Sequence, residues 1–183
     1  MAISALDRRT ALILVDLQKG IVAYDTLPPT SGVVAQAARL AEAFRKQGQP
    51  VVLVNVTGGA PGRVEQSRSG ATPPSDWADL VTELCVQPQD YRVTKKTWGA
   101  FTGTDLEQYL KSCGVTQVVL AGISTSIGVE STARAAYELG FNVVLVKDAM
   151  TDTNADAHSN SLSRIFPRLG EIGTTADVLA LLG

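Results

Sequence analysis

The sequence has few of the side chains that bind transition metals or form disulfide frameworks. Its 183 residues include two cysteines, Cys85 and Cys113, and a single histidine, His158. Two cysteines are too few for a disulfide framework, and one histidine excludes a zinc site that needs two or more imidazole ligands. No clustered cysteine spacing replaces the missing histidines. We therefore predict a protein that uses no metal and no other cofactor.

The sequence also has no large excess of positive or negative charge and no long apolar run. The chain has 16 basic and 18 acidic residues, a net charge of −2, which argues against a dedicated nucleic-acid binder. The longest apolar runs, at 11–15 and 118–123, are far shorter than the ~20 residues of a membrane helix. The opening MAISALDRRT lacks the basic start and apolar stretch of a secretory signal. We predict a cytoplasmic protein that binds neither nucleic acid nor membranes.

The chain does contain a regular alternation of β-rich runs and helical patterns. The runs predict strands at 11–16, 51–56, 91–96, 117–122, 142–148 and 170–174. The patterns between them predict helices at 31–50, 75–84, 104–114, 126–139, 156–166 and 175–182. Such alternation favours a three-layer α/β/α fold with a six-stranded, mostly parallel, Rossmann-like sheet and helices on both faces. The length fits one domain, residues 1–183.

Ligands of such sheets bind outside the carboxyl ends of the strands, near the point where the strand order reverses. The positions that follow strands are Asp16, the 57–75 loop, Lys95 with Lys96, the 123–128 turn and Asp148. A carboxylate that is buried at the end of an apolar strand has a raised pKa, which suits proton transfer. An N-cap or a loop anchor would also explain Asp16, and a solvated side chain would explain either lysine.

Four stretches resemble the isochorismatase-like hydrolase superfamily, also called the cysteine hydrolases. They are ILVDLQKG, VVLVNV, KKTWGAFTGTDLEQYLKSCGV and VVLAGISTSIGVESTARAAYELGFNVVLVKDAMTD. The third resembles the family pattern K-x-x-x-S/G-A-F-x-x-T-x-L, which selects Lys95 over Lys96. The fourth resembles the nucleophile motif G-x-x-T-x-x-C-V-x-x-T, with Gly128 in place of the cysteine. The resemblance covers nearly the whole chain and implies the isochorismatase-like fold.

In most members of this superfamily an Asp, a Lys and a Cys converge on the substrate, and these correspond to Asp16, Lys95 and position 128. Gly128 has no nucleophile, and neither Cys85 nor Cys113 lies where it could substitute. True isochorismatases resemble this sequence in that departure, and they hydrolyse a vinyl ether instead of an amide. The resemblance thus implies a hydrolase of a small polar metabolite. Asp16 would supply the proton, and Lys95 would bind a substrate carboxylate or stabilise the negative charge of Asp16.

The resemblance also suggests which residues contact the substrate: Gln18, Trp98, Phe101, Ile123 and Ser124. Gln18, in the family's Asp-x-Gln, would orient substrate or water. A cis peptide between Ile123 and Ser124 would aim the backbone N–H groups of Ser124 and residue 128 at a developing oxyanion. The two aromatic residues would wall the pocket, contact a neighbouring subunit or simply pack. Family members form dimers or tetramers, so we expect a homo-oligomer.

Other functions stay open at this point. STSIGVEST resembles the amidase-type motif with its cysteine replaced, so the protein is alternatively a catalytically silent member that binds a small ligand or serves as an oligomeric structural protein. Substitute nucleophiles for amide hydrolysis are Ser124, Thr125 and Ser126, although such residues more commonly cap a helix. Arg63 and Arg68 are candidates for a carboxylate contact, or are merely solvated. His158 is predicted on the surface of a helix.

Overall fold

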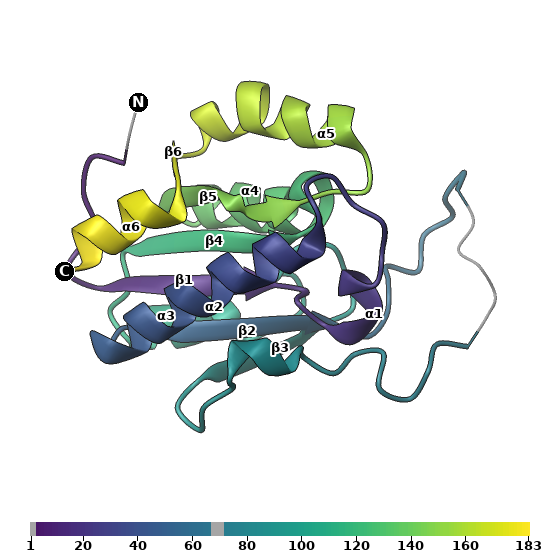
Figure 1. Ribbon diagram of the computed structural model, residues 1–183, viewed down its shortest axis with the longest axis horizontal. Helices are drawn as coiled ribbons and strands as arrows, with labels where there is room; N and C mark the ends of the chain where they lie inside the picture. The colour runs from purple at the N-terminus through teal and green to yellow at the C-terminus, as the bar shows by residue number, and fades with distance from the viewer. Residues whose placement is uncertain (1–2, 67–71) are drawn as a thin grey trace.

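The strands of the computed structural model, which describes residues 3–66 and 72–183, form one sheet (Figure 1). They are β1 (Thr10–Val15), β2 (Val51–Val56), β3 (Tyr91–Lys95), β4 (Gln117–Ile123), β5 (Asn142–Thr151) and β6 (Glu171–Gly173). Their order is β3-β2-β1-β4-β5-β6, and every neighbouring pair is parallel. The prediction of a six-stranded parallel sheet is confirmed.

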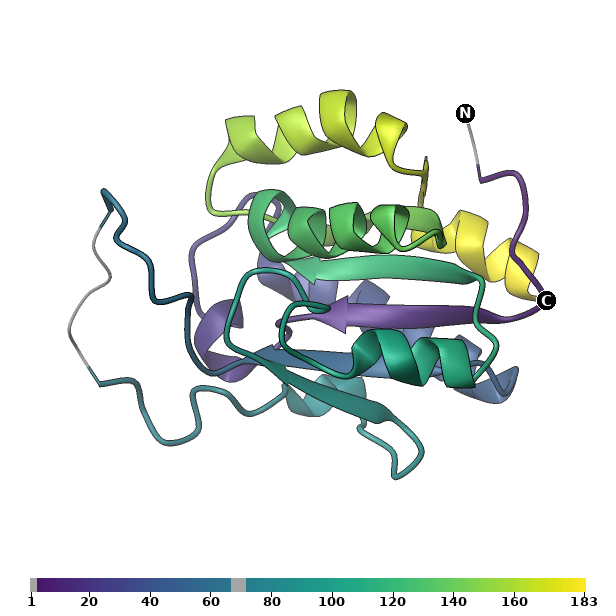
Figure 2. The ribbon, with the colours of Figure 1, turned by 180° about the vertical axis from the view of Figure 1, so that it is seen from behind.

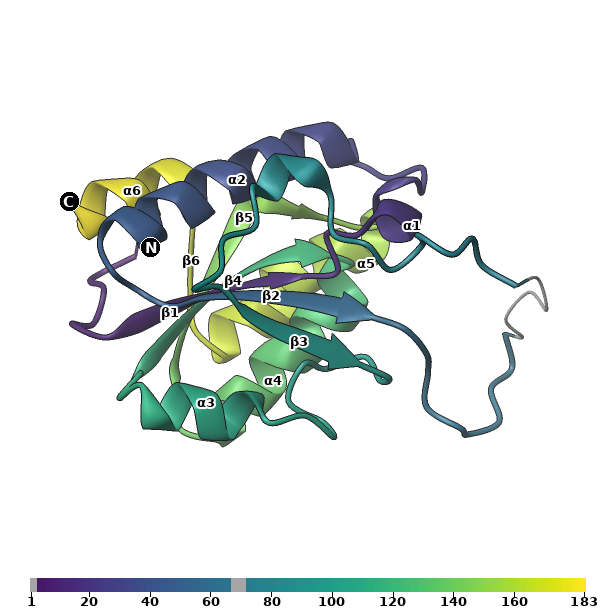
Figure 3. The same cartoon turned by 90° about the horizontal axis from the view of Figure 1, so that it is seen from below.

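Helices cover both faces of the sheet, as predicted (Figure 3). One face carries α2 (Thr30–Lys46) and α6 (Thr175–Leu182). The other carries α3 (Leu106–Ser112), α4 (Glu130–Glu138) and α5 (Ala155–Asn160), with the turns η3 (Ser161–Ile165) and η4 (Phe166–Arg168) continuing from α5. No helix in the described ranges is long and apolar enough to cross a bilayer.

The apolar run of β1 is explained by burial on both of its sides. Leu12 and Leu14 belong to the core cluster beneath α2, whereas Ala11, Ile13 and Val15 belong to the cluster beneath α3 and α4. None of the five is more than 1% exposed. Because helices cover both faces, the strand needs apolar side chains at every position and not at alternate ones.

The strand order reverses between β1 and β4, and the carboxyl ends of these strands adjoin. Val15 pairs with Gly122 at this end. Gly122 has a φ of 123°, and a Cβ on it would lie 2.1 Å from the Val15 carbonyl oxygen. Only glycine therefore lets β4 approach β1 this closely. An open α/β sheet binds its ligands at such a switch point.

The predicted helix at 75–84 is wrong. Only a short turn, η1 (Thr82–Leu84), forms there, and a small helix that was not predicted, α1 (Lys19–Val22), lies after β1. The carbonyls of Trp77 and Asp79 accept hydrogen bonds from the backbone N–H groups of Gly20 and Lys19, at 2.9 and 2.8 Å. These carbonyl groups therefore accept hydrogen bonds from the loop after β1 instead of from N–H groups of a helix.

The end of β5 and the start of the helix that precedes this strand also differ from prediction. Because β5 continues to Thr151, Asp148 lies inside the strand, where its Oδ1 accepts the Thr175 N–H at the start of α6. Asp148 is therefore not at the ligand-binding edge, and Asp152 takes that place. The helix predicted at 126–139 begins with a π-helical turn, η2 (Thr125–Val129), before α4.

Candidate active site

A cleft of about 670 Å³ lies at the carboxyl ends of the central strands. In Figure 1 these ends point toward the long loop between β2 and β3. The floor of the cleft includes Asp16, Lys95 and Gly128, and its walls include Tyr24, Trp77 and Trp98. The cleft therefore has a charged floor and an aromatic mouth at the switch point of the sheet.

Asp16 and Lys95 form a buried ion pair across the floor. Asp16 directly follows β1 with a left-handed φ of 53°, and its N–H donates to the Val54 carbonyl at 2.9 Å. Lys95 ends β3, and its Nζ lies 2.7 Å from Asp16 Oδ2, with side-chain exposures of 2% and 8%. Residues alternate between the faces of a strand, so the neighbouring Lys96 is exposed. The structure thus brings Asp16 together with Lys95, as the motif predicted.

The carboxyl group of Asp16 is only half satisfied. Its buried Oδ1 has no hydrogen-bond partner among the described residues. Burial raises the pKa of Asp16 to about 6, although the charge of Lys95 and its hydrogen bond act in the opposite direction. Desolvation therefore outweighs the ion pair, and both protonation states are accessible near neutral pH.

Position 128 lies directly beside this carboxyl group. A Cβ on Gly128 would lie 3.4 Å from Asp16 Oδ2 and 3.0 Å from Val15 Cγ1. Any side chain at this position would therefore project against the acid. The Ile123–Ser124 peptide that leads into the turn is cis, as the resemblance implied.

Three of the five predicted substrate contacts line the cleft, and two do not. Trp98, Ile123 and Ser124 line it, and Trp98 is 58% exposed at the mouth. Gln18 is fully buried, where its amide bonds the backbone N–H and C=O of Val56 and the carbonyl of Trp77. In the structure Gln18 braces the cleft walls, and its contact with substrate stays a prediction.

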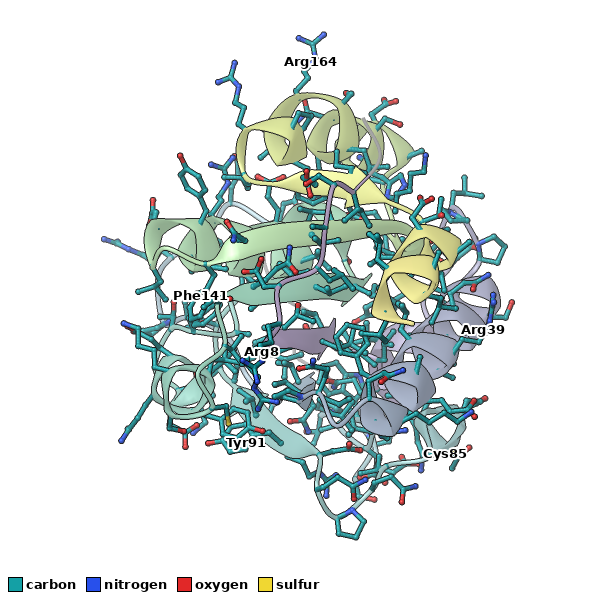
Figure 4. All side chains as sticks on the ribbon, turned by 90° about the vertical axis from the view of Figure 1, so that its left-hand side faces the viewer. Arg8, Arg39, Cys85, Tyr91, Phe141 and Arg164 are labelled. Carbon is teal, nitrogen blue, oxygen red and sulfur yellow. The ribbon has the colours of Figure 1, made fainter. Side chains whose placement is uncertain are left out.

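Phe101 is also placed away from the cleft. Its ring stacks on Phe141, with ring centroids 6.1 Å apart. Phe141 directly precedes β5, at the end of the sheet opposite the cleft. This end of the sheet faces the viewer in Figure 4, where Phe141, Arg8 and Tyr91 are labelled. Phe101 therefore has the packing role that the sequence also allowed, and its contact with substrate stays a prediction.

The hydroxyl groups of the turn are mostly engaged in holding it. Thr125 is fully buried, and its Oγ1 lies 2.8 Å from Nδ1 of His158. The N–H and Oγ of Ser126 both donate to Asp152 Oδ2, each at 2.8 Å. Of the three candidate hydroxyl nucleophiles, Ser124 alone lines the cleft.

The pattern had predicted His158 as a surface residue. The structure instead places it half-buried against the turn, where burial lowers its pKa and Asp152 opposes that shift. Sequence reasoning missed Asp152 altogether. The sequence of the segment DAMTD could have indicated Asp152. The apolar Ala149 and Met150 extend the strand, so that it ends directly before the second aspartate, Asp152.

The remaining predicted residues lie elsewhere. Arg63 is exposed, and Arg68 lies outside the described residues. Cys85 is exposed and Cys113 is partly buried, and neither lines the cleft. Of the 57–75 loop, Thr57, Gly58 and the described end at 72–74 belong to the cleft wall.

Known proteins resemble this chain over nearly its full length. A family model described as "Isochorismatase domain" matches residues 10–177. The uncharacterized isochorismatase family protein YwoC of Bacillus subtilis (strain 168) is 44% identical over 179 residues, 94% of this chain and 93% of its own. Phenazine biosynthesis protein PhzD1 of Pseudomonas aeruginosa is 29% identical and covers 94% of this chain and 86% of its own. A solved isochorismatase family protein from Burkholderia thailandensis has a TM-score of 0.95 and 43% identity, with 99% of both chains covered.

Proposed function

The chain belongs to the isochorismatase family of hydrolases, and we propose that it hydrolyses a vinyl ether of a small polar metabolite by acid catalysis. One observation carries this proposal: Asp16 is a buried, half-satisfied carboxyl group beside a residue without a side chain. By the motif resemblance, Gly128 would correspond to the cysteine of amide-cleaving relatives. Without that thiol, the proton of Asp16 is the reactive group that the site offers.

The reaction begins with a proton transfer from Asp16 to the terminal carbon of the vinyl group. The double-bond electrons form the new C–H bond, and the adjacent ether oxygen stabilises the positive charge as an oxocarbenium ion. Water adds to the cationic carbon and returns a proton to the Asp16 carboxylate. The resulting hemiketal collapses to an alcohol and a carbonyl compound. No side chain forms a covalent bond with the substrate.

Lys95 adjusts the strength of this acid. Its charge and its hydrogen bond lower a pKa that burial raises, so that Asp16 is a stronger acid than desolvation alone would leave. After the proton transfer, the ammonium group faces the newly formed carboxylate at 2.7 Å. In a site shielded from water this attraction is stronger than in bulk solvent. Lys95 therefore favours the charge distribution that follows the first step.

Turnover of isochorismate, which contains a vinyl ether, and of a panel of small amides tests the proposal. The wild type should hydrolyse isochorismate, and Asp16→Asn should lower kcat/KM by about 10²- to 10⁴-fold, the usual contribution of a general acid. Asp25→Asn is a matched control, because it makes the same chemical change at an exposed acid near the cleft residue Tyr24. This control should retain the wild-type rate.

Two outcomes would count against the proposal. Turnover of neither substrate class would favour the binding-only member of the family. Amide cleavage that survives without a cysteine would instead mean that a hydroxyl group attacks, with Ser124 the first residue to replace because it lines the cleft.

A further inference from the structure

Thr132 joins two segments that the proposed chemistry needs at a fixed distance. It lies in α4 and is fully buried. Its Oγ1 donates to the Gly128 carbonyl at 2.7 Å and accepts the Ala100 N–H at 3.1 Å. Gly128 belongs to the turn before α4, and Ala100 belongs to the segment after Lys95, whose course can be followed in Figure 2. One hydroxyl group therefore connects both catalytic segments.

The segment after β3 is tied back to Lys95 by its own hydrogen bonds. Lys95 Nζ donates to the Thr97 carbonyl at 3.2 Å as well as to Asp16, and Thr97 Oγ1 donates to the Gly99 carbonyl at 3.2 Å. Gly99 lies against α4, since a Cβ on it would be 3.4 Å from the Ser131 carbonyl oxygen. The ammonium group, the segment 97–100 and the first turn of α4 thus form one connected assembly.

An isolated threonine in a helix often bonds the carbonyl four residues before it, and that bond alone has no functional meaning. Thr132 differs because its oxygen also accepts an N–H from another part of the chain. The fully buried hydroxyl thus donates to one catalytic segment and accepts from the other. Loss of the hydroxyl would leave the buried Ala100 N–H without a partner, which is costly.

We propose that Thr132 is a positioning residue, whose hydroxyl group sets the spacing between Gly128 and the Asp16–Lys95 pair. Its kinetic consequence rests on the proposed function, whereas its effect on the ion pair does not. Without the hydroxyl, the segment 97–100 separates from α4 and Lys95 moves away from Asp16. The acid then experiences less of the lysine charge.

Three variants test this inference. Thr132→Val keeps the shape and removes the hydroxyl, and Thr132→Ser keeps the hydroxyl. Thr10→Val is the matched control, because Thr10 is equally buried and its Oγ1 donates to the Gln117 carbonyl at the opposite end of β1. The Asp16 carboxyl is titrated by ¹³C NMR in the ligand-free protein, with its resonance assigned from the spectrum of Asp16→Asn.

Thr132→Val should raise the Asp16 midpoint by about half a pH unit or more, since a weaker lysine interaction favours the neutral acid. It should also lower kcat on a vinyl ether about tenfold, with a smaller change in KM, as expected when a catalytic group is misplaced by less than an ångström. Thr132→Ser should restore both values. Thr10→Val should lose comparable stability and leave both values at those of the wild type.

The inference is overturned if Thr132→Val and Thr10→Val give the same Asp16 midpoint. Thr132→Ala, which also removes the hydroxyl, provides the same comparison if the valine variant does not fold. A wild type that hydrolyses no vinyl ether would end the proposed function alone, because the NMR titration needs no substrate. The two ideas can therefore fail separately.

Discussion

Two buried acid–base pairs in this molecule differ in how completely the carboxylate is bonded. Arg45 in α2 contacts both oxygens of Asp90, with Nε–Oδ1 and Nη2–Oδ2 distances of 3.0 and 2.7 Å. The Gln87 N–H adds a third bond to Asp90, at 2.7 Å. Asp16 receives one bond from Lys95, and its Oδ1 has no partner among the described residues. Both acids are nearly inaccessible, with side-chain exposures of 0% and 8%.

The difference separates an ion pair that holds the fold from one that is available for chemistry. The bidentate contact of Arg45 fixes the segment before β3 against α2 and leaves neither oxygen of Asp90 unbonded. Asp16 instead has a high free energy as a carboxylate, because burial is incompletely compensated by Lys95. Burial by itself therefore does not distinguish the two acids, whereas burial together with an unbonded oxygen in a cleft makes Asp16 the candidate for the proposed chemistry.

Replacement of Asp90 by alanine should have the largest effect on stability. The variant leaves the Arg45 guanidinium, only 12% exposed, without its carboxylate partner, and breaking such a buried pair costs about 3–5 kcal/mol. Urea unfolding measures this loss. The kcat/KM of the folded fraction should stay close to that of the wild type, because Asp90 does not line the cleft. A loss of turnover beyond the unfolded fraction would erase the distinction between the two pairs.

The pH dependence of turnover gives the next largest effect. Asp16 must be protonated to act as an acid, so kcat/KM should be constant below its pKa of about 6 and fall about tenfold per pH unit above it. If Asp16 were a base that activates a nucleophile, kcat/KM would instead rise up to pH 6 and then level off. The slope of log kcat/KM between pH 6 and 8 therefore decides between the two roles.

Stability should follow the same titration. Because the folded-state pKa of Asp16 is raised above its ordinary value of 3.8, the folded protein binds more protons than the unfolded chain between pH 3.8 and about 6. The contribution of Asp16 to stability is thus fully present below this window and is lost as the pH rises through it. The difference in urea midpoint between the wild type and Asp16→Asn, measured across this range, should change in that direction.

The sheet could be predicted because its central strands are buried on both faces. Runs such as ALILV and VVLVNV have no polar face, and a strand between two helical layers is the structure that such runs favour. Asp16 and Lys95 could also be placed, since each directly follows or ends a strand and the strand ends meet at one edge. The bonding of the Asp16 carboxyl group, on which its proposed role rests, could not be predicted, because it depends on distances between β1 and β3.

What escaped prediction depended on contacts between distant segments. The 75–84 segment has a helical composition, but its carbonyl groups bond the loop after β1. No local pattern reveals that the backbone of Val56 and Trp77 occupies the amide of Gln18. His158 looked like a surface residue, because nothing near it in the sequence indicates Thr125. Each error came from a partner far away along the chain.

A third kind of pair, exposed to solvent, should have the smallest effect. Lys19 Nζ lies 3.0 Å from Asp76 and 3.3 Å from Asp79, with side chains that are 45% to 60% exposed. Asp76 raises the pKa of Lys19, and Lys19 lowers that of Asp76, but water and salt screen such charges.

The Lys19 charge pairs join α1 to the segment that contains Trp77. The backbone hydrogen bond from the Gly20 N–H to the Trp77 carbonyl joins the same two segments and does not depend on the charges. Asp76→Asn should therefore leave the urea midpoint and the KM unchanged in both low and high salt. If Asp76→Asn instead lowered the urea midpoint about as much as Asp90→Ala does, the exposed pair would be holding Trp77 on the cleft wall. The contribution of an ion pair to stability would then depend on how many hydrogen bonds its carboxylate makes, and not on how deeply the pair is buried.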